Sequence, residues 1–154
     1  MKRFWTLTVV VAALVCFAFA GTALADKKAD AKALVESGIA MVKAKGFDAA
    51  LAAVKDKKGP FVKGELYIFA GSTEKPELIA HPINPKLVGK NMSKMKDVKG
   101  KFFFMEFMNT AKSPGQGWVE YWWPKPGEKK ASPKDTYVMK VPGKPVWFAC
   151  GFYK

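Results

Sequence analysis

The sequence predicts an α+β domain in which the helices come first and an antiparallel β-sheet follows. Three observations carry this prediction. Apolar residues recur at helical spacing between residues 28 and 45. Runs of β-branched and aromatic residues, typical of strands, begin after Gly59-Pro60. The last three of these runs follow one another with no helix between them, which is the order of an antiparallel meander.

Two helices are expected in the first part of the domain. The apolar spacing within Lys28–Lys45 indicates one amphipathic helix, and Gly46 is expected to end it. Asp48 is the expected N-cap of a short second helix, Ala49–Lys55. Gly59-Pro60 then separates the helices from the strands.

A hairpin, a loop and a helix are expected in the middle of the chain. Glu65–Ala70 should form a strand, with Leu78–His81 pairing back to it across a turn. His81–Lys90 contains two prolines and is expected to cross the domain as an ordered loop. Lys101–Lys112 is rich in Phe and Met, so it should be a helix that is buried on two sides.

The C-terminal part is expected to supply three strands, Trp118–Trp123, Thr136–Val141 and Val146–Tyr153. The first alternates, so that Tyr121 and Trp123 share one face with Val119. Pro124–Lys134, rich in Pro, Gly and Lys, should be a loop, and a Pro142-Gly143 turn should join the last two strands.

The first residues predict export. Lys2 and Arg3 precede an uncharged apolar run, and Ala23-Leu24-Ala25 offers small residues where a signal peptidase cuts. Residues 1–25 are therefore expected to be a signal peptide, and residues 26–154 one periplasmic domain of 129 residues. An uncleaved anchor helix is the less favoured alternative because the apolar run is short. Lipidation at Cys16 is a minor one, since this Cys lies inside the apolar run.

The charge of the chain argues against a nucleic-acid partner. Without the signal peptide, 24 basic and 13 acidic side chains remain, and every basic one is Lys because Arg3 is the only Arg. Proteins that read bases or clamp phosphates rely on the planar guanidinium of Arg. The excess of Lys is consistent with solubility, with attraction of small anions or with contact to anionic lipid.

Metal-binding and nucleotide-binding chemistry find no support in the residues. His81 is the only His, and neither paired metal-ligand spacings nor a phosphate-binding Gly-rich loop occur. We therefore expect no cofactor. Cys150 is the one Cys outside the signal peptide, and its alternating surroundings predict a small buried residue rather than a nucleophile.

Aromatic and basic residues lie close together between Trp118 and Tyr137. Tyr121 and Trp123 share a strand face, and the loop that follows returns through Lys134 to Tyr137. An apolar wall with a cation suits a small organic anion, with Lys134 neutralising a carboxylate and the two tyrosines donating hydrogen bonds. In the alternative interpretation, the aromatics are ordinary core and Lys134 is a solvated loop residue. Residue spacing alone favours neither.

Five segments, taken together and in their order along the chain, indicate a family. They are His81–Asn91, Asp97–Gly100 before the Phe-rich helix, Gly117–Pro124, Pro133–Val138 and Trp147–Tyr153. Together they resemble the single Cache domain of bacterial extracytoplasmic sensors, over Lys28–Tyr153. The resemblance implies a PAS-like antiparallel sheet preceded by a long N-terminal helix. It also implies a pocket on that sheet for small ligands, often short carboxylates, lined here by Tyr121, Trp123, Lys134 and Tyr137.

The resemblance also places His81 at the start of the crossing loop. There its imidazole is expected to hold the loop backbone through hydrogen bonds. Direct contact with a ligand is the less favoured alternative for His81.

We therefore expect a periplasmic, non-enzymatic, sensor-type domain that binds a short organic anion such as a small carboxylate. Cache domains usually sit between membrane spans, and the sequence predicts no second span. The domain is then expected to deliver its ligand to a membrane receptor, kinase or transporter, or to sequester it. The alternative is a lysine-rich module that contacts membranes or acidic proteins while its pocket is vestigial. An enzyme is less favoured still, because no acid–base or nucleophile pair is visible.

The first testable prediction concerns the mature N-terminus. Protein recovered from the periplasmic fraction should begin at Asp26, or within two residues of it, because the small-x-small site ends at Ala25. Intact mass measures this directly. Full-length protein in the membrane fraction would contradict the prediction.

Overall fold

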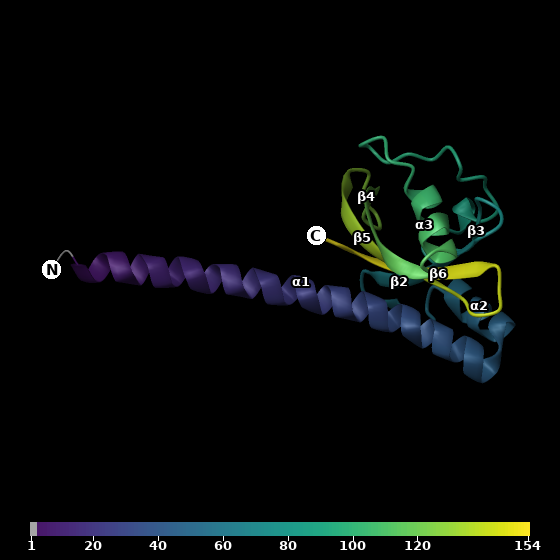
Figure 1. Ribbon diagram of the computed structural model, residues 1–154, viewed down its shortest axis with the longest axis horizontal. Coiled ribbons are helices and arrows are strands. Elements are labelled where there is room, and N and C mark those ends of the chain that lie inside the picture. Colours follow the sequence, from purple (N-terminus) through teal and green to yellow (C-terminus); the bar gives the residue numbers. More distant parts are fainter. Residues whose placement is uncertain (1–2) are drawn as a thin grey trace. The chain divides into compact units, whose positions relative to one another are not determined.

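The computed structural model describes the backbone of residues 3–154 and the side chains from Leu24 onward (Figure 1). By its contacts the chain divides into two compact units, residues 1–30 and residues 31–154. Of the predicted signal peptide, residues 1–25, only Leu24 and Ala25 have described side chains. The prediction therefore lies almost wholly outside the described side chains. Within the described part of the chain, no helix has the length and hydropathy to cross a membrane.

The order of elements agrees with the predicted α+β arrangement. The helices are α1 (Arg3–Lys45), α2 (Phe47–Lys55), the short 3₁₀ turn η1 (Pro85–Leu87) and α3 (Phe103–Lys112). The strands are β1 (Val62–Lys63), β2 (Leu66–Ser72), β3 (Leu78–Ala80), β4 (Gln116–Pro124), β5 (Ala131–Lys140) and β6 (Val146–Tyr153). The expected hairpin is present, since β3 pairs antiparallel with β2.

The strands form one antiparallel sheet in the order β1-β2-β6-β5-β4. Strand β3 also belongs to this sheet and pairs with β2 outside that order. The last strand of the chain therefore lies between β2 and β5, and all eight of its residues are buried. Strands β2 and β5 are more than 50 residues apart in sequence, and β6 pairs with one of them on each side.

Each face of the sheet carries its own hydrophobic core. Residues 31–54 of α1 and α2 pack on one face, with Ile68, Phe148 and Phe152 from the strands. On the other face α3 packs against Phe69, Tyr121 and Trp147. Figure 1 shows α2 and α3 on opposite sides of β6. Because side chains alternate along a strand, each strand contributes to both cores.

The structure corrects several expected boundaries. The N-cap of α2 is Gly46 and not Asp48, which lies in the first turn of the helix. The φ of Gly46 is 89°, a backbone conformation that Gly adopts readily. Strand β5 begins at Ala131, so Lys134 lies on a strand and not on a loop. Helix α3 buries one broad face only, because Phe102 before it is exposed and Glu106 on it is half-exposed.

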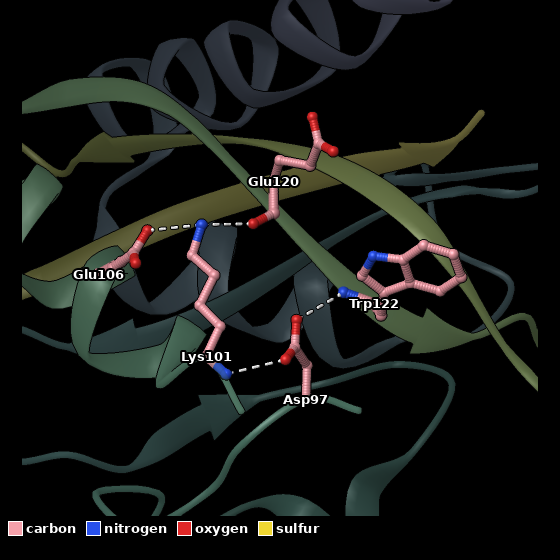
Figure 2. A network of polar contacts seen from close by, with 5 residues as sticks. All are labelled: Asp97, Lys101, Glu106, Glu120 and Trp122. Atoms are coloured by element: carbon pink, nitrogen blue, oxygen red, sulfur yellow. Dashed lines mark hydrogen bonds and ion pairs between the residues drawn. The ribbon is translucent and has the colours of Figure 1, made fainter. Parts of the chain in front are cut away.

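A loop before α3 is fastened to the edge strand β4 by Asp97 (Figure 2). One carboxylate oxygen of Asp97 accepts hydrogen bonds from the backbone N–H groups of Lys99 and Lys101, at 2.8 and 2.9 Å. The other accepts from the Trp122 N–H at 3.0 Å. Lys101 Nζ donates to the Glu120 carbonyl at 2.6 Å and pairs with Glu106 at 2.9 Å. The loop thus satisfies backbone groups that an edge strand would leave open.

The contribution of Asp97 to the free energy of unfolding should therefore depend on pH. Burial alone would raise the pKa of Asp97, but the three N–H donors and the charge of Lys101 outweigh it and lower the pKa below 3.8. The lowered folded pKa means that the stabilisation is complete above about pH 3.8 and is lost as the pH falls through the folded value.

Asp97→Asn tests this contribution, because an amide has one acceptor oxygen and leaves some of the three N–H groups unpaired. We expect a loss of roughly 1–3 kcal/mol in urea unfolding at neutral pH. Asp56→Asn is the matched control, since Asp56 accepts only the Lys58 N–H at an exposed site, and it should cost about 0.5 kcal/mol or less. Equal losses in both variants would contradict the role given to Asp97.

Candidate functional site

A cavity of about 20 Å³ lies between α3 and the sheet. Its wall is mainly aromatic and aliphatic, and two side chains on it, His81 and Lys134, are basic. The lining residues are Tyr67, Phe69, Leu78, His81, Leu87, Met92, Phe103, Phe104, Phe107, Tyr121, Trp123 and Lys134. An apolar enclosure with a few polar groups is the usual composition of a small-molecule site.

Lys134 is the unusual member of this wall, since only 1% of it is exposed. Its Nζ donates a hydrogen bond to the Tyr67 hydroxyl at 3.0 Å. It lies over the rings of Tyr67 and Tyr153, 4.6 and 4.8 Å from their centroids. Among the described side chains no carboxylate comes within ion-pair distance of it. Aromatic faces attract a cation but do not neutralise it, so the site holds an uncompensated positive charge.

The backbone of β6 makes room for the stem of Lys134. β5 and β6 are neighbours in the sheet, and Lys134 pairs with Tyr153. A Cβ atom on Gly151 would lie 2.6 Å from the Cε atom of Lys134 and would also collide with the Thr136 hydroxyl. Only a residue without a side chain at position 151 allows the lysine to lie flat against this strand.

Three phenols surround the ammonium group. Burial raises the pKa of Tyr67, Tyr121 and Tyr153 to about 12, and for Tyr121 and Tyr153 the charge of Lys134 opposes this rise. All three are therefore neutral near pH 7 and carry O–H donors. The Tyr153 hydroxyl donates to the Pro124 carbonyl at 2.7 Å, which holds the end of β4 next to the cavity.

His81 is the second basic residue on the wall, and it is uncharged. Burial, and then the nearby charge of Lys134, lower the pKa of His81 to about 4. Its Nδ1 accepts the Asn84 N–H at 3.0 Å, so the neutral imidazole carries its proton on Nε2. The expected role in holding the crossing loop is confirmed by this bond. The ring also stacks on Phe69, with centroids 5.6 Å apart, and lines the cavity.

The structure brings three of the four sequence-predicted residues together. Tyr121, Trp123 and Lys134 line one cavity. The fourth expectation is corrected: Tyr137 lies in the core on the opposite face, where its hydroxyl donates to the Gln116 side chain at 2.8 Å. Lys134 and Tyr137 are three residues apart on β5, and an odd separation puts two strand residues on opposite faces.

Sequence reasoning missed Tyr67, which contacts the Lys134 ammonium directly. One signal was available, because Tyr67 and Phe69 alternate within the predicted strand and so share a face. Nothing local indicated that this face meets Lys134. That proximity depends on β6 lying between β2 and β5.

A second, larger hollow of about 300 Å³ adjoins the cavity. The two share Tyr67, His81 and Trp123, so these three side chains form the boundary between them. The outer hollow is completed by Asn84 and by the β4–β5 loop from Lys125 to Glu128. We refer to it as the vestibule, because it adjoins the inner cavity.

Metal and thiol chemistry are not represented at the site. Within the described residues, no group of three or more His, Cys, Asp or Glu side chains is arranged to hold a metal ion. Cys150 is fully buried, and burial raises the pKa of its thiol to about 12. A thiol in this state is unreactive, which confirms its interpretation as a small buried residue.

Comparison with known proteins places these features in a family. A sequence model described as "Cache domain" matches residues 48–153. A 64-residue segment is 38% identical to the methyl-accepting chemotaxis protein McpP of Pseudomonas putida. The match covers 42% of this chain and spans 12% of the length of that protein.

Solved structures agree with the sequence match. A periplasmic sensor domain of a chemotaxis protein superposes with a TM-score of 0.69 and 30% identity, covering 84% of this chain and 96% of that one. A Cache chemosensory domain studied for carboxylic acid recognition gives 0.63 and 28%, covering 90% and 95%. A methyl-accepting chemotaxis protein from Vibrio parahaemolyticus gives 0.72 at 22%, covering 86% and 92%, and so supports the fold.

These matches agree with the six-stranded antiparallel sheet and the preceding helix. They cover nearly all of the described unit from residue 31 onward. The chain belongs to the Cache domain family of extracytoplasmic ligand-sensing domains.

Proposed function

We propose that residues 26–154 form a periplasmic, non-enzymatic sensor domain that binds a short organic monocarboxylate in the inner cavity. The observation that carries this proposal is the buried ammonium group of Lys134, which has no carboxylate partner among the described side chains. Burial of an unpaired charge is unfavourable by several kcal/mol, and a bound anion relieves this cost. The ligand therefore completes an ion pair whose other half is built into the fold.

The groups around the cavity favour a carboxylate over other small molecules. Lys134 and the neutral phenols of Tyr67 and Tyr121 all offer hydrogen-bond donors, and the wall includes no acidic residue. We infer that the ligand oxygens lie near Lys134 Nζ, with Tyr121 and the His81 Nε2–H as further donors. The apolar part of the ligand would then lie against Phe103 and Trp123.

Charge and volume limit the ligand further. One lysine balances one negative charge, so a second carboxylate would enter the cavity without a partner. The inner cavity, at about 20 Å³, has room for little more than a carboxylate head. A somewhat longer chain would extend past His81 and Trp123 into the vestibule.

The relatives support a sensory role. McpP is a methyl-accepting chemotaxis protein, and one structural neighbour was studied for carboxylic acid recognition by a Cache chemosensory domain. We propose that the exported domain hands its ligand-dependent state to a membrane receptor, kinase or transporter. Export itself is proposed from the signal sequence with cleavage after Ala25.

Lys134→Met tests the proposed function, because it keeps the aliphatic stem and removes the charge. A thermal-shift panel of acetate, propionate, malonate and propionamide should first single out a monocarboxylate. Calorimetric titration of that compound should then show Lys134→Met weakening binding by roughly 1.5–3 kcal/mol, about 10- to 150-fold in Kd. The ligand-free variant should melt at the same temperature or higher, since an unpaired buried charge is gone.

The control is Lys129→Met in the exposed part of the β4–β5 loop, where solvent screens the charge. It should change affinity far less. If both variants bind the monocarboxylate as the native protein does, Lys134 is not the anion-recognising group. If propionamide binds as well as propionate, the cavity does not select for charge.

A further prediction concerns His81, whose neutrality leaves Nε2–H as a donor toward the ligand. Its pKa falls from 6.5 in the unfolded chain to about 4 in the folded one. Because the folded pKa is the lower one, His81 favours folding above pH 6.5, and this contribution declines as the pH drops toward 4. The full difference corresponds to about 3 kcal/mol.

NMR checks this prediction cleanly, because His81 is the only His and gives one set of imidazole signals. Its resonance should titrate near pH 4, and the stability of His81→Gln in urea should depend less on pH between 6.5 and 4. An imidazole titrating at 6.5 in the folded protein would refute the neutral, buried state.

A further inference from the structure

The loop that Asp97 fastens to β4 presents apolar side chains to solvent. Val98 is 69% exposed and Phe102 is 43% exposed, the two largest exposures among the large hydrophobic residues of the described chain. They lie four positions apart on one short segment, residues 96–102, which we name the 96–102 loop. Single exposed apolar residues are common on soluble proteins, but a pair on one protruding turn is not explained by packing.

Lysines surround this apolar pair. Lys94, Lys96 and Lys99 are exposed, and two of them lie over aromatic rings, Lys96 at 4.6 Å from Phe102 and Lys99 at 4.9 Å from Trp122. The one acidic residue of the loop, Asp97, points inward and accepts three backbone N–H groups. The nearby carboxylate of Glu106 pairs with Lys101 (Figure 2), and that of Glu120 pairs with Lys154. The outward charge of the loop is therefore positive.

The loop is also held in one shape. The Asp97 N–H donates to the Lys101 carbonyl and the Gly100 N–H to the Asp97 carbonyl, each at 3.0 Å. These bonds close a tight turn with Val98 at its tip. Little conformational freedom is left to lose when the tip is buried, so a partner can gain from a small apolar contact.

We propose that the 96–102 loop docks on the surface of an anionic lipid bilayer. Val98 and Phe102 would enter the boundary between headgroups and acyl chains, with Lys96 and Lys99 next to the lipid phosphates. The composition of the loop favours lipid over a protein partner. Protein interfaces are enriched in Arg and depleted in Lys, whereas this loop and the whole chain from Asp26 contain no Arg. A diffuse anionic surface needs only positive charge and an apolar tip.

This docking does not depend on the ligand cavity, because none of Val98, Lys99 and Phe102 lines it. The two inferences can therefore fail separately. The expected affinity of the loop for an anionic membrane is modest. Each lysine near the surface improves binding by about fivefold, and high salt removes most of that gain.

The experiment places a polarity-sensitive dye on the tip of the loop. The mature chain from Asp26 is used with Val98→Cys, and the dye reports position 98 alone because Cys150 is fully buried. Phosphatidylglycerol vesicles should shift the dye emission to the blue at low salt, and phosphatidylcholine vesicles should not. The matched control is Val88→Cys, an exposed apolar position outside the loop, which should show a smaller shift.

Two charge variants complete the design. Lys96→Gln with Lys99→Gln should weaken the response at position 98 by about 25-fold in lipid concentration. Lys57→Gln with Lys58→Gln removes the same charge from an exposed site elsewhere and should weaken it far less. Equal shifts at positions 98 and 88, or no shift with phosphatidylglycerol, would overturn the proposal. So would a shift given by poly-glutamate and not by vesicles, which would indicate an acidic protein partner.

Discussion

The ammonium group of Lys134 determines how one whole face of this domain is organised. A lysine that is 1% exposed must be surrounded by groups that tolerate a positive charge, and here these are aromatic rings and one phenol oxygen. Burial, and then the same charge, keep His81 neutral, and the ammonium group faces phenols that remain protonated. The wall of the cavity thus offers hydrogen-bond donors and includes no acidic residue, so its electrostatics suit a negatively charged group.

The local sequence pattern was sufficient for some of this site and misleading for the rest. Strict alternation in Trp118–Trp123 correctly put Tyr121 and Trp123 on one face. The burial of Lys134 was hidden, because Ala131–Lys134 contains Ser, Pro and Lys, residues that usually mark an exposed loop. These residues form a strand because they pair with β4 over their whole length. Tyr137 is close to Lys134 in sequence but lies on the other face of the sheet, because side chains along a strand alternate with a period of two.

Long-range topology explains what no local pattern contains. Tyr67 and Lys134 are 67 residues apart and meet because β6 is inserted between their two strands. His81 reaches the same wall from the end of the β2–β3 hairpin. The family resemblance anticipated the sheet and a pocket on it, since several ordered segments together carry more information than any one of them. The contacts of individual side chains, however, followed only from the register of the strands.

The bare backbone at Gly151 has a consequence for how this protein can change over generations. The stem of Lys134 occupies the space that any side chain at position 151 would need. A larger residue there would meet both the Thr136 hydroxyl and the Cε atom of Lys134, so shortening position 134 alone would not make room for it. Gly151 and the two β5 side chains that it faces, Lys134 and Thr136, therefore constrain one another's size. Replacement of this glycine would thus disturb the packing that holds the ammonium group of Lys134 at the cavity wall.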